Sequence, residues 1–253
     1  MNKLISILLF VPSLIIAQEG NTKVLNYRDI DNKAVHFGFS IGTNFSDFNF
    51  IRNESSVGKG TFEGYKIYSD MDQPLQTIGF NVNIVSEYRF NKYFSLRFTP
   101  GLILTSARPV TFTKYTKADT TSHTANIESN YLDFPVYIKF SSKRINNYRP
   151  YLLTGGSFRY DLVARKNYPG SADNGTMPAI KLQKDPPIDI SFDFGFGIDF
   201  YLVYFKFSTE LKLSTGLMNV LYDEPPPDQR LYDYWNSLDG LKSSLFIISL
   251  SFE

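Results

Sequence analysis

The chain of 253 residues has no cysteine, one tryptophan and only two histidines. The absence of thiols excludes disulfides and cysteine-based metal sites, although a closed β-sheet needs neither. The histidines, His36 and His123, offer little for catalysis, and no HExxH, GxSxG, GxGxxG or P-loop pattern occurs. His123, beside Ser122 and near Asp119, leaves a surface hydrolase as a minor alternative. We therefore predict no catalytic residues, no metal and no cofactor, and a protein that is not an enzyme.

Long apolar runs are also missing. Past residue 17 no run approaches the 18 residues of a membrane-spanning helix. A shorter apolar run, residues 4–16, follows the basic start at Lys3 and precedes the small Ala17 and the polar Gln18. This pattern predicts a secretory signal peptide, residues 1–17, cut between Ala17 and Gln18, with a short membrane helix as the alternative. We expect a periplasmic N-terminal segment at residues 18–33 and one barrel domain at residues 34–253.

The chain lacks an excess of charge of either sign. Without Lys3 it holds 25 basic residues, which equals its 25 acidic residues. The sequence has no polybasic patch, so we do not expect nucleic acid as a partner. The 23 Phe and 17 Tyr residues form a heavy aromatic load, which is typical of membrane interfaces.

What the chain does have is alternation. Every second residue from Ile188 to Phe200 is a large hydrophobe, and the residues between are small or charged. Side chains along a strand alternate between its two faces, so the segment predicts a strand with one apolar and one polar face. The same pattern predicts eight strands, near residues 35–48, 78–89, 94–104, 132–140, 152–164, 188–200, 203–213 and 246–252.

The connections between these strands alternate between short and long. Short ones fall near residues 91–92, 142–149 and 201–202, and long ones span residues 49–76, 108–125, 167–187 and 217–240. In an up-and-down meander, alternate connections lie at opposite ends. The sequence thus predicts an all-β fold, an eight-stranded antiparallel up-and-down transmembrane β-barrel with short periplasmic turns and long extracellular loops.

The polar strand faces carry nearly balanced charges, which are expected to point into the lumen. A basic side chain facing lipid would cost about 2–4 kcal/mol at the midplane. Because eight strands enclose a lumen that side chains can fill, we favour an ion-pair network over a selective pore. Its predicted members are Glu87, Arg89, Arg97, Asp133, Lys139, Arg159, Asp161, Asp189, Asp193, Asp199, Lys206, Glu210 and Lys212.

Two prolines complicate this picture. Pro100 and Pro135 fall inside predicted strands, where proline has no N–H to donate to the neighbouring strand, and local bulges are one way to accommodate them. Tyrosines near the short turns are expected to form a periplasmic aromatic belt: Tyr93, Tyr148, Tyr151, Tyr201 and Tyr204.

The last long loop is a candidate contact surface. It contains three consecutive prolines, residues 225–227, followed by Tyr232, Tyr234 and Trp235. Exposed aromatic residues are typical anchors in protein interfaces. The alternative is that they fold onto the rim or into the headgroup layer.

Several segments resemble the PorT family of outer-membrane barrels, which belongs to the type IX secretion system. Matching pieces are His36-Phe37-Gly38-Phe39, Leu96-Arg97-Phe98-Thr99-Pro100-Gly101 and Tyr131-Leu132-Asp133-Phe134-Pro135, and the last two also occur more widely in related porin-like barrels. More specific pieces are the run Lys143-Arg144-Ile145-Asn146-Asn147-Tyr148-Arg149-Pro150-Tyr151, and Gly195 to Phe200 continuing through Phe205 to Glu210. The resemblance covers residues 34–253, and both prolines belong to the shared pieces.

The resemblance implies a non-enzymatic role in protein export across the outer membrane, and in gliding species in export of adhesins. It implies outer-membrane lipid and other secretion-system proteins as partners, with no small-molecule substrate and no nucleic acid. Within the shared turn, Lys143, Arg144 and Arg149 are candidate periplasmic contacts, although such charges also simply keep a rim solvated. A small porin-like channel or ligand-binding barrel is the second interpretation.

Overall fold

The protein is described by a computed structural model that covers residues 25–27, 33–52, 77–106, 108–115, 120–127, 129–163, 187–221 and 238–253. Its strands are β1 (Val35–Arg52), β2 (Thr77–Arg89), β3 (Phe94–Phe98), β4 (Gly101–Leu104), β5 (Arg108–Tyr115), β6 (Thr120–Ile127), β7 (Asn130–Ser141), β8 (Tyr148–Asp161), β9 (Ile188–Tyr201), β10 (Lys206–Gly216) and β11 (Leu238–Phe252). Within those ranges there is no helix that is long and apolar enough to cross a membrane.

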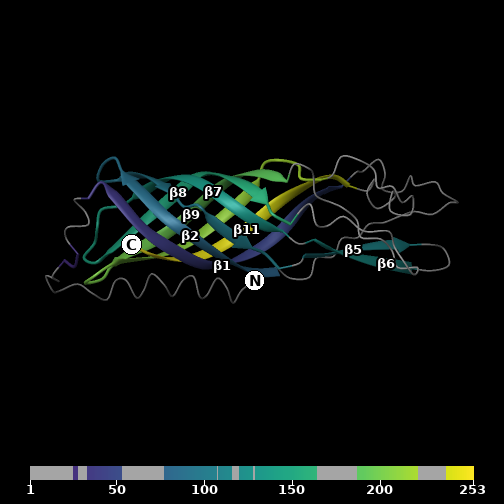
Figure 1. Cartoon of the computed structure of the whole chain (residues 1–253), viewed down its shortest axis with the longest axis horizontal. Helices are drawn as coiled ribbons and strands as arrows, with labels where there is room; N and C mark the ends of the chain where they lie inside the picture. Colours follow the sequence, from purple (N-terminus) through teal and green to yellow (C-terminus); the bar gives the residue numbers. More distant parts are fainter. Residues whose placement is uncertain are drawn as a thin grey trace.

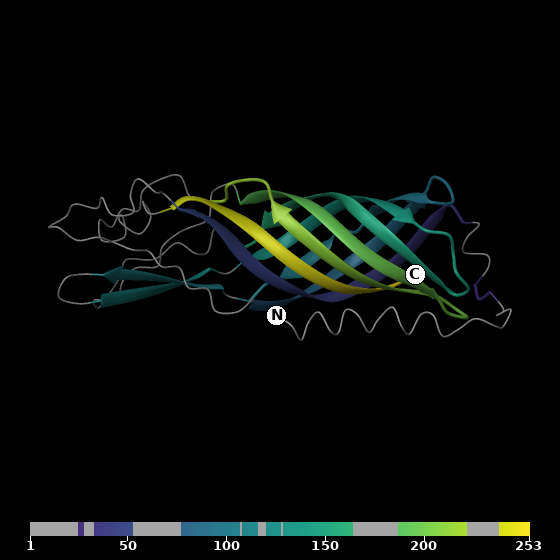
Figure 2. The same cartoon turned by 180° about the vertical axis from the view of Figure 1, so that it is seen from behind.

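The strands close into an eight-stranded ring, in which β3 and β4 together take the place of one interrupted strand (Figures 1 and 2). Every neighbouring pair is antiparallel, and the ring closes where β1 pairs with β11. That seam runs from Phe39 opposite Phe252 to Arg52 opposite Leu238. The predicted eight-stranded antiparallel barrel is confirmed.

The two prolines interrupt the hydrogen-bond ladder without shifting its register. The N–H of Ile84 donates to the carbonyl of Pro100 at 2.9 Å, and the N–H of Thr99 donates to the carbonyl of Pro135 at 3.3 Å. Proline has no N–H group to donate in the opposite direction, so each of these residue pairs makes one backbone hydrogen bond instead of the usual two. The register is the same for β3 and β4, both against β2 and against β7, so the expected bulges do not form.

The connections have the predicted asymmetry. Residues 90–93, 142–147 and 202–205 make the short connections, which lie at the same end as the start of β1 and the end of β11. Residues 53–76, 105–129, 162–187 and 217–237 make the long ones. The second of these was expected to be a loop, but it contains the β5–β6 hairpin, paired from Arg108 opposite Ile127 to Tyr115 opposite Thr120. The hairpin extends beyond the barrel at the end opposite the C-terminus (Figure 1).

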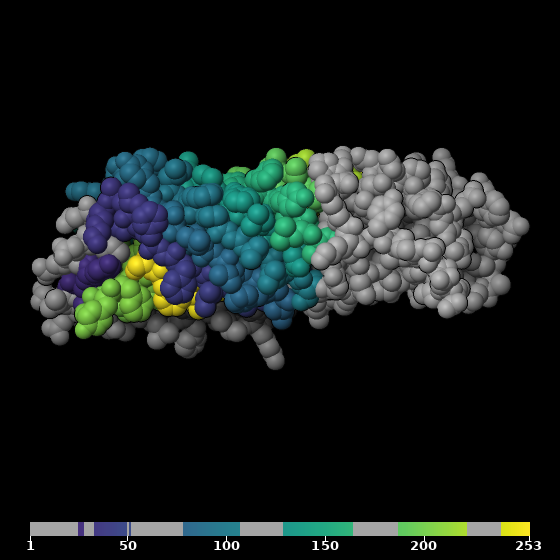
Figure 3. Space-filling model, in the orientation of Figure 1, coloured from purple at the N-terminus to yellow at the C-terminus, as the bar shows by residue number. Residues whose placement is uncertain are grey.

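Side chains alternate in and out around the whole ring. On β9, Phe192, Phe194 and Phe196 are 52%, 49% and 45% exposed, while Asp193 between the first two of them and Asp189 earlier on the strand are buried. The exterior therefore carries apolar side chains around the ring. Figure 3 shows one face of this exterior, coloured along the sequence. An exposed apolar surface of this extent around a closed barrel is suited to lipid and not to water.

Candidate functional site

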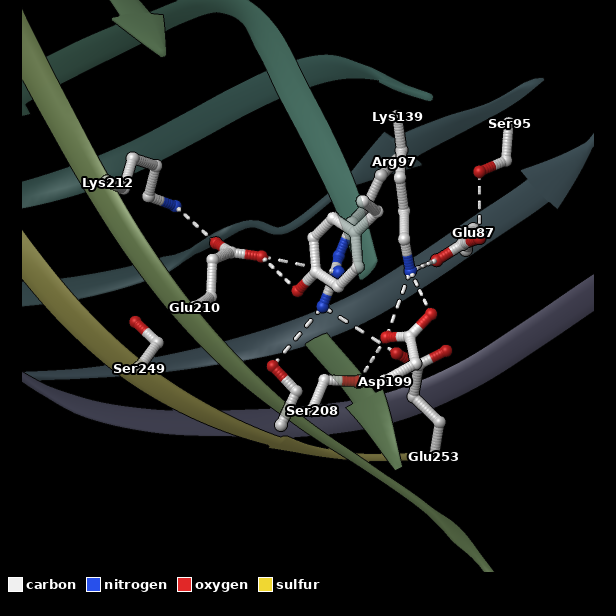
Figure 4. A network of polar contacts seen from close by, with 12 residues as sticks. Glu87, Ser95, Arg97, Lys139, Asp199, Ser208, Glu210, Lys212, Ser249 and Glu253 are labelled. Carbon is white, nitrogen blue, oxygen red and sulfur yellow. Dashed lines mark hydrogen bonds and ion pairs between the residues drawn. The ribbon is translucent and has the colours of Figure 1, made fainter. Parts of the chain in front are cut away.

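The interior of the barrel is built from charges on several strands. In the part nearer the short turns, the ammonium group of Lys139 lies 2.9 Å from Asp199 and 3.2 Å from Glu87. Both carboxylates accept a further hydrogen bond, Glu87 from Ser95 and Asp199 from Ser208. Figure 4 shows these side chains converging from different strands.

Two further cations, Arg97 of β3 and Lys206 of β10, join the same cluster. Arg97 lies 3.4 Å from Glu210 and 3.6 Å from Glu253, and Lys206 lies 2.7 Å from Glu253. Lys206 also lies 4.0 Å from Glu87, which links this group to the Lys139 group. Glu253 was not predicted as a lumen residue, yet it extends the inward parity of β11 by one position beyond Ser251.

A further cluster lies toward the long connections. Arg159, whose side chain is 0% exposed, lies 3.2 Å from Asp133 and 3.6 Å from Asp193 and also donates to the hydroxyl of Ser214. Asp193 accepts hydrogen bonds from Ser157 at 2.7 Å as well. Its neighbour Asp189 accepts a hydrogen bond from Ser243, so this cluster reaches across to β11.

Two tyrosines and a lysine connect the clusters. The hydroxyl of Tyr137 donates to Asp193 at 2.8 Å, and that of Tyr151 donates to Glu210 at 3.0 Å. Lys212 pairs with Glu210 at 3.3 Å and lies over the Tyr137 ring at 4.6 Å. Tyr151 was predicted in the periplasmic belt, which is wrong, because its odd-numbered position on β8 faces the lumen.

The tyrosine belt is corrected at one more position. Tyr201 is 1% exposed, and its ring lies under the guanidinium of Arg144 at 3.8 Å. Tyr93 and Tyr204 are exposed, as a belt requires. The signal that separates them was available in the sequence, since Tyr201 continues the inward parity of Asp199 and Tyr204 lies in a turn.

An apolar cluster also occupies the interior. Ile103 of β4, Tyr131 of β7 and the residues Leu245 and Ile247 of β11 are buried against one another. β4 and β7 are neighbours in the ring, whereas β11 lies several strands away from both, so the cluster crosses the lumen. Ion pairs and this apolar cluster together fill the inside of the barrel, which disfavours an open channel.

The inward positions of β1 and β11 differ from all of these. From residue 38 to 48 on β1 and from 241 to 251 on β11 they carry no charged side chain; we call this surface the neutral wall. A Cβ atom added at Gly42 would lie 2.9 Å from both Asn81 Oδ1 and Ser249 Oγ and would meet the carbonyl of Ile248. The neutral wall is therefore tightly packed, and small residues there leave room for the long charged side chains.

The short-turn rim is held by two arginines. Arg149 donates from Nε to the carbonyl of Ser142 at 2.8 Å and also to the carbonyl of Lys92, so it ties the 142–147 turn to the 90–93 turn. Arg144 donates to the carbonyl of Asn146 at 2.8 Å and to Asn147 Oδ1 at 3.0 Å. Both predicted contact residues are thus parts of the rim's own structure.

A cavity of about 720 Å³ lies at this rim. It is formed by the residues that precede β1, the 90–93 turn and the 142–147 turn with the start of β8. Of the described residues, those that line it include no acid and six cations: Lys33, Arg89, Lys92, Lys143, Arg144 and Arg149.

Two predicted network members lie at the ends of the lumen. Arg89 is half-buried and lines the rim cavity. Asp161 is buried at the other end, where it accepts hydrogen bonds from the backbone N–H groups of Asn130 and Val163. Lying outside the described residues are Ala17, Gln18, Tyr232, Tyr234 and Trp235, so their predicted roles stay predictions.

The described residues hold no group of three or more His, Asp and Glu side chains arranged to bind a metal ion. His36 is buried at the start of β1. Of the residues that suggested a hydrolase, His123 and Ser122 lie on β6, and Asp119 lies outside the described residues. The charged residues of the lumen are engaged with one another, which is an arrangement for filling and stabilising a barrel.

A closed antiparallel ring with an apolar exterior and a charged interior defines an integral outer-membrane barrel protein. The chain belongs to the family described as outer membrane protein beta-barrel domain, whose model matches residues 16–222. The protein is accordingly located in the outer membrane. The periplasmic side of the short turns stays a prediction from the pattern of short and long connections.

Comparison with curated proteins gives no match. Among solved structures, the chain is similar to Neisserial surface protein A (NspA), with 11% identity and a TM-score of 0.40, over 87% of this chain and 98% of that chain. It is similar to Ail, the attachment invasion locus protein of Yersinia pestis, with 13% identity and a TM-score of 0.35, over 87% and 98%. It is also similar to OprG from Pseudomonas aeruginosa, with 10% identity and a TM-score of 0.35, over 86% and 93%.

Proposed function

We propose that this protein is a non-enzymatic outer-membrane barrel that serves protein export by the type IX secretion system through partner contacts at its rims. The observation that carries the proposal is the position of the segment from Lys143 to Tyr151. This segment, which bears the specific resemblance to the PorT family, forms the turn between β7 and β8 and lines the rim cavity.

The filled lumen supports a role at the rims. Arg97, Lys139 and Arg159 are each buried in the interior with carboxylate partners. Removing such a charge from its partners is strongly unfavourable, so the interior is a poor route for a translocated chain. What remains accessible to other proteins is the periplasmic rim and the long connections.

The direct test is deletion of the gene followed by comparison of the secreted proteome. We expect surface and extracellular proteins to be depleted from the medium and their precursors to accumulate in the cell. Complementation with the wild-type chain should restore export, and a Lys242→Gln chain, altered only near the opposite rim, should restore it equally. An unchanged secreted proteome after deletion would refute the proposal.

The second candidate is a small porin-like channel or a ligand-binding barrel. The rim cavity favours the ligand-binding form, because its volume lies in the range of about 300–1,000 Å³ that is usual for ligand pockets. Planar-bilayer conductance clearly above leak would favour the channel form instead, since the filled lumen predicts conductance at the leak level.

A further inference from the structure

The six cations around the rim cavity divide into two kinds. Arg144 and Arg149 direct their guanidinium groups at carbonyl and amide oxygens of the turns, as described above. Lys33, Lys92 and Lys143 are exposed, and their ammonium groups form no ion pair with any residue that the structure describes. The arginines therefore shape the cavity, and the lysines present charge to whatever enters it.

The cavity lies over the mouth of the lumen. Arg89 and Arg149 occupy inward-facing positions near the ends of β2 and β8, on the same faces as Glu87 and Tyr151. The lining of the cavity thus continues the interior surface, whereas the lipid-facing surface carries the alternate residues such as Tyr88. This position faces the aqueous periplasm and is accessible to a soluble protein.

Among the residues that the structure describes, no carboxylate pairs with the three exposed lysines. Glu87, the nearest carboxylate on β2, already pairs with Lys139 and accepts from Ser95. The carboxylates of the lumen are engaged with interior cations, so the positive charge that the cavity presents is that of the three exposed lysines. Charge complementarity then requires an anionic occupant.

We propose that the cavity binds an acidic segment of a periplasmic partner protein, with Lys33, Lys92 and Lys143 as its contact residues. The inference rests on the proposed function and names the chemistry of the partner. A cavity of about 720 Å³ is much larger than a single phosphate or carboxylate ion, and it suits a short stretch of peptide. Three separate lysine ammonium groups, on turns that arginines hold in place, can each pair with one carboxylate of an extended acidic segment.

Binding can be measured on the full-length barrel purified in a zwitterionic detergent. The probe is a fluorescently labelled hexaglutamate peptide, and hexaglutamine with the same label is the neutral comparison. We expect the triple variant Lys33→Gln, Lys92→Gln, Lys143→Gln to bind hexaglutamate about tenfold more weakly, since each exposed ion pair contributes a few-fold. The wild-type affinity should also fall steeply with added salt.

The matched control is Lys242→Gln, which removes one half-buried charge near the opposite rim, on β11. It should bind hexaglutamate like the wild type. Equal binding of hexaglutamate and hexaglutamine, or equal binding by the triple variant and the wild type, would overturn the proposal.

Two other occupants are distinguished by the same assay. If vesicles of phosphatidylglycerol displace hexaglutamate while vesicles of phosphatidylcholine do not, the site is a lipid headgroup site and the proposal fails. The sequence places Asp29 and Asp31 shortly before Lys33. If the variant Asp29→Asn, Asp31→Asn binds hexaglutamate at least tenfold more tightly than the wild type, the chain's own acids are the occupant and the proposal fails.

An assay in cells separates this inference from the proposed function. The triple lysine variant should insert normally and should reproduce the export defect of the deletion. If deletion abolishes export but the triple variant exports normally, the proposed function stands and the acidic-segment site is overturned. If deletion leaves export unchanged, the proposed function itself fails, whatever the peptide assay shows.

Discussion

The charged wall of the lumen, formed by the inward faces of β7 to β10, and the neutral wall of β1 and β11 use opposite means to fill the same space. The charged wall sends long side chains such as Arg159 and Lys139 toward the axis, where they meet carboxylates at about hydrogen-bonding distance. The neutral wall offers glycine, serine and asparagine together with the apolar pair Leu245 and Ile247. Long side chains fit on one side because short ones stand opposite.

This difference separates two sources of stability. On the charged wall, each ion depends on partners from other strands, so loss of one partner leaves a buried charge uncompensated. On the neutral wall, stability depends on close approach of backbones, so added volume is harmful and lost polarity matters little. Substitutions on the two walls should therefore differ in how much stability they remove.

The largest loss is expected from Arg159→Leu. The substitution leaves Asp133 and Asp193 buried without their common cation and should reduce the free energy of unfolding by about 3–5 kcal/mol. The measurement is urea unfolding of the barrel in lipid vesicles. Ser40→Ala, a buried polar deletion on the neutral wall, should cost less than about 1 kcal/mol. Equal losses for the two variants would remove the distinction between the walls.

The next largest effect compares the lipid-facing side of β9 with the turn that follows this strand. Phe194→Arg places a cation on the lipid face in the middle of the strand and should cost about 2–4 kcal/mol. Tyr204→Arg, in the exposed turn after the same strand, should cost about 0–1 kcal/mol. Unfolding in the same vesicles measures both, and a larger loss at Tyr204 would contradict the assignment of the apolar face to lipid.

A moderate effect is expected on the neutral wall from Gly42→Ala. The new methyl group would lie against Asn81, Ser249 and the carbonyl of Ile248, so overpacking should cost about 1–3 kcal/mol. Gly156→Ala is the matched control, because a Cβ atom added at Gly156 would meet only the carbonyl oxygen of Ser191, at 3.1 Å. The control should lose clearly less stability. If both variants unfold at the same urea concentration, close packing of the neutral wall does not limit stability.

The smallest effect separates the rim arginines from the rim lysines. Arg149→Gln removes donors to the carbonyls of Ser142 and Lys92 and should cost about 1.5 kcal/mol. Faster cleavage of the short turns by protease added from the periplasmic side would report the loosened rim. Lys92→Gln should leave both stability and cleavage unchanged, and cleavage that rises equally in both variants would show that Arg149 does not brace the turns.

Much of the barrel could be predicted from the sequence because alternation records which face of each strand meets lipid. The eight staves, the short and long connections and the inward direction of residues such as Lys139 follow from period and charge alone. Hydrogen-bond partners across the lumen do not, because they depend on strand stagger and on side chains from staves that are distant in sequence. The pairing of Arg159 with both Asp133 and Asp193 is of this kind.

The prediction failed where residue type was given more weight than parity. Tyr151 and Tyr201 were placed in a belt because tyrosine is typical of interfaces, although their positions continue the inward series. The β5–β6 hairpin was missed because residues 108–127 lack a large-hydrophobe alternation, which is the signal of a strand with one face on lipid. The rim cavity was missed because it forms between three segments that are far apart in sequence.

The seam between β1 and β11 governs how such a cylinder enters a membrane. The two strands stand at opposite ends of the described barrel, so the ladder between them joins the partners that are most distant in sequence and closes the longest loop. Before that ladder exists, an open sheet would present unpaired backbone groups and the cations of its concave side to acyl chains. Insertion and pairing of β1 with β11 must therefore occur together, so that the unpaired backbone groups of these two strands are kept from the hydrocarbon until the ring closes.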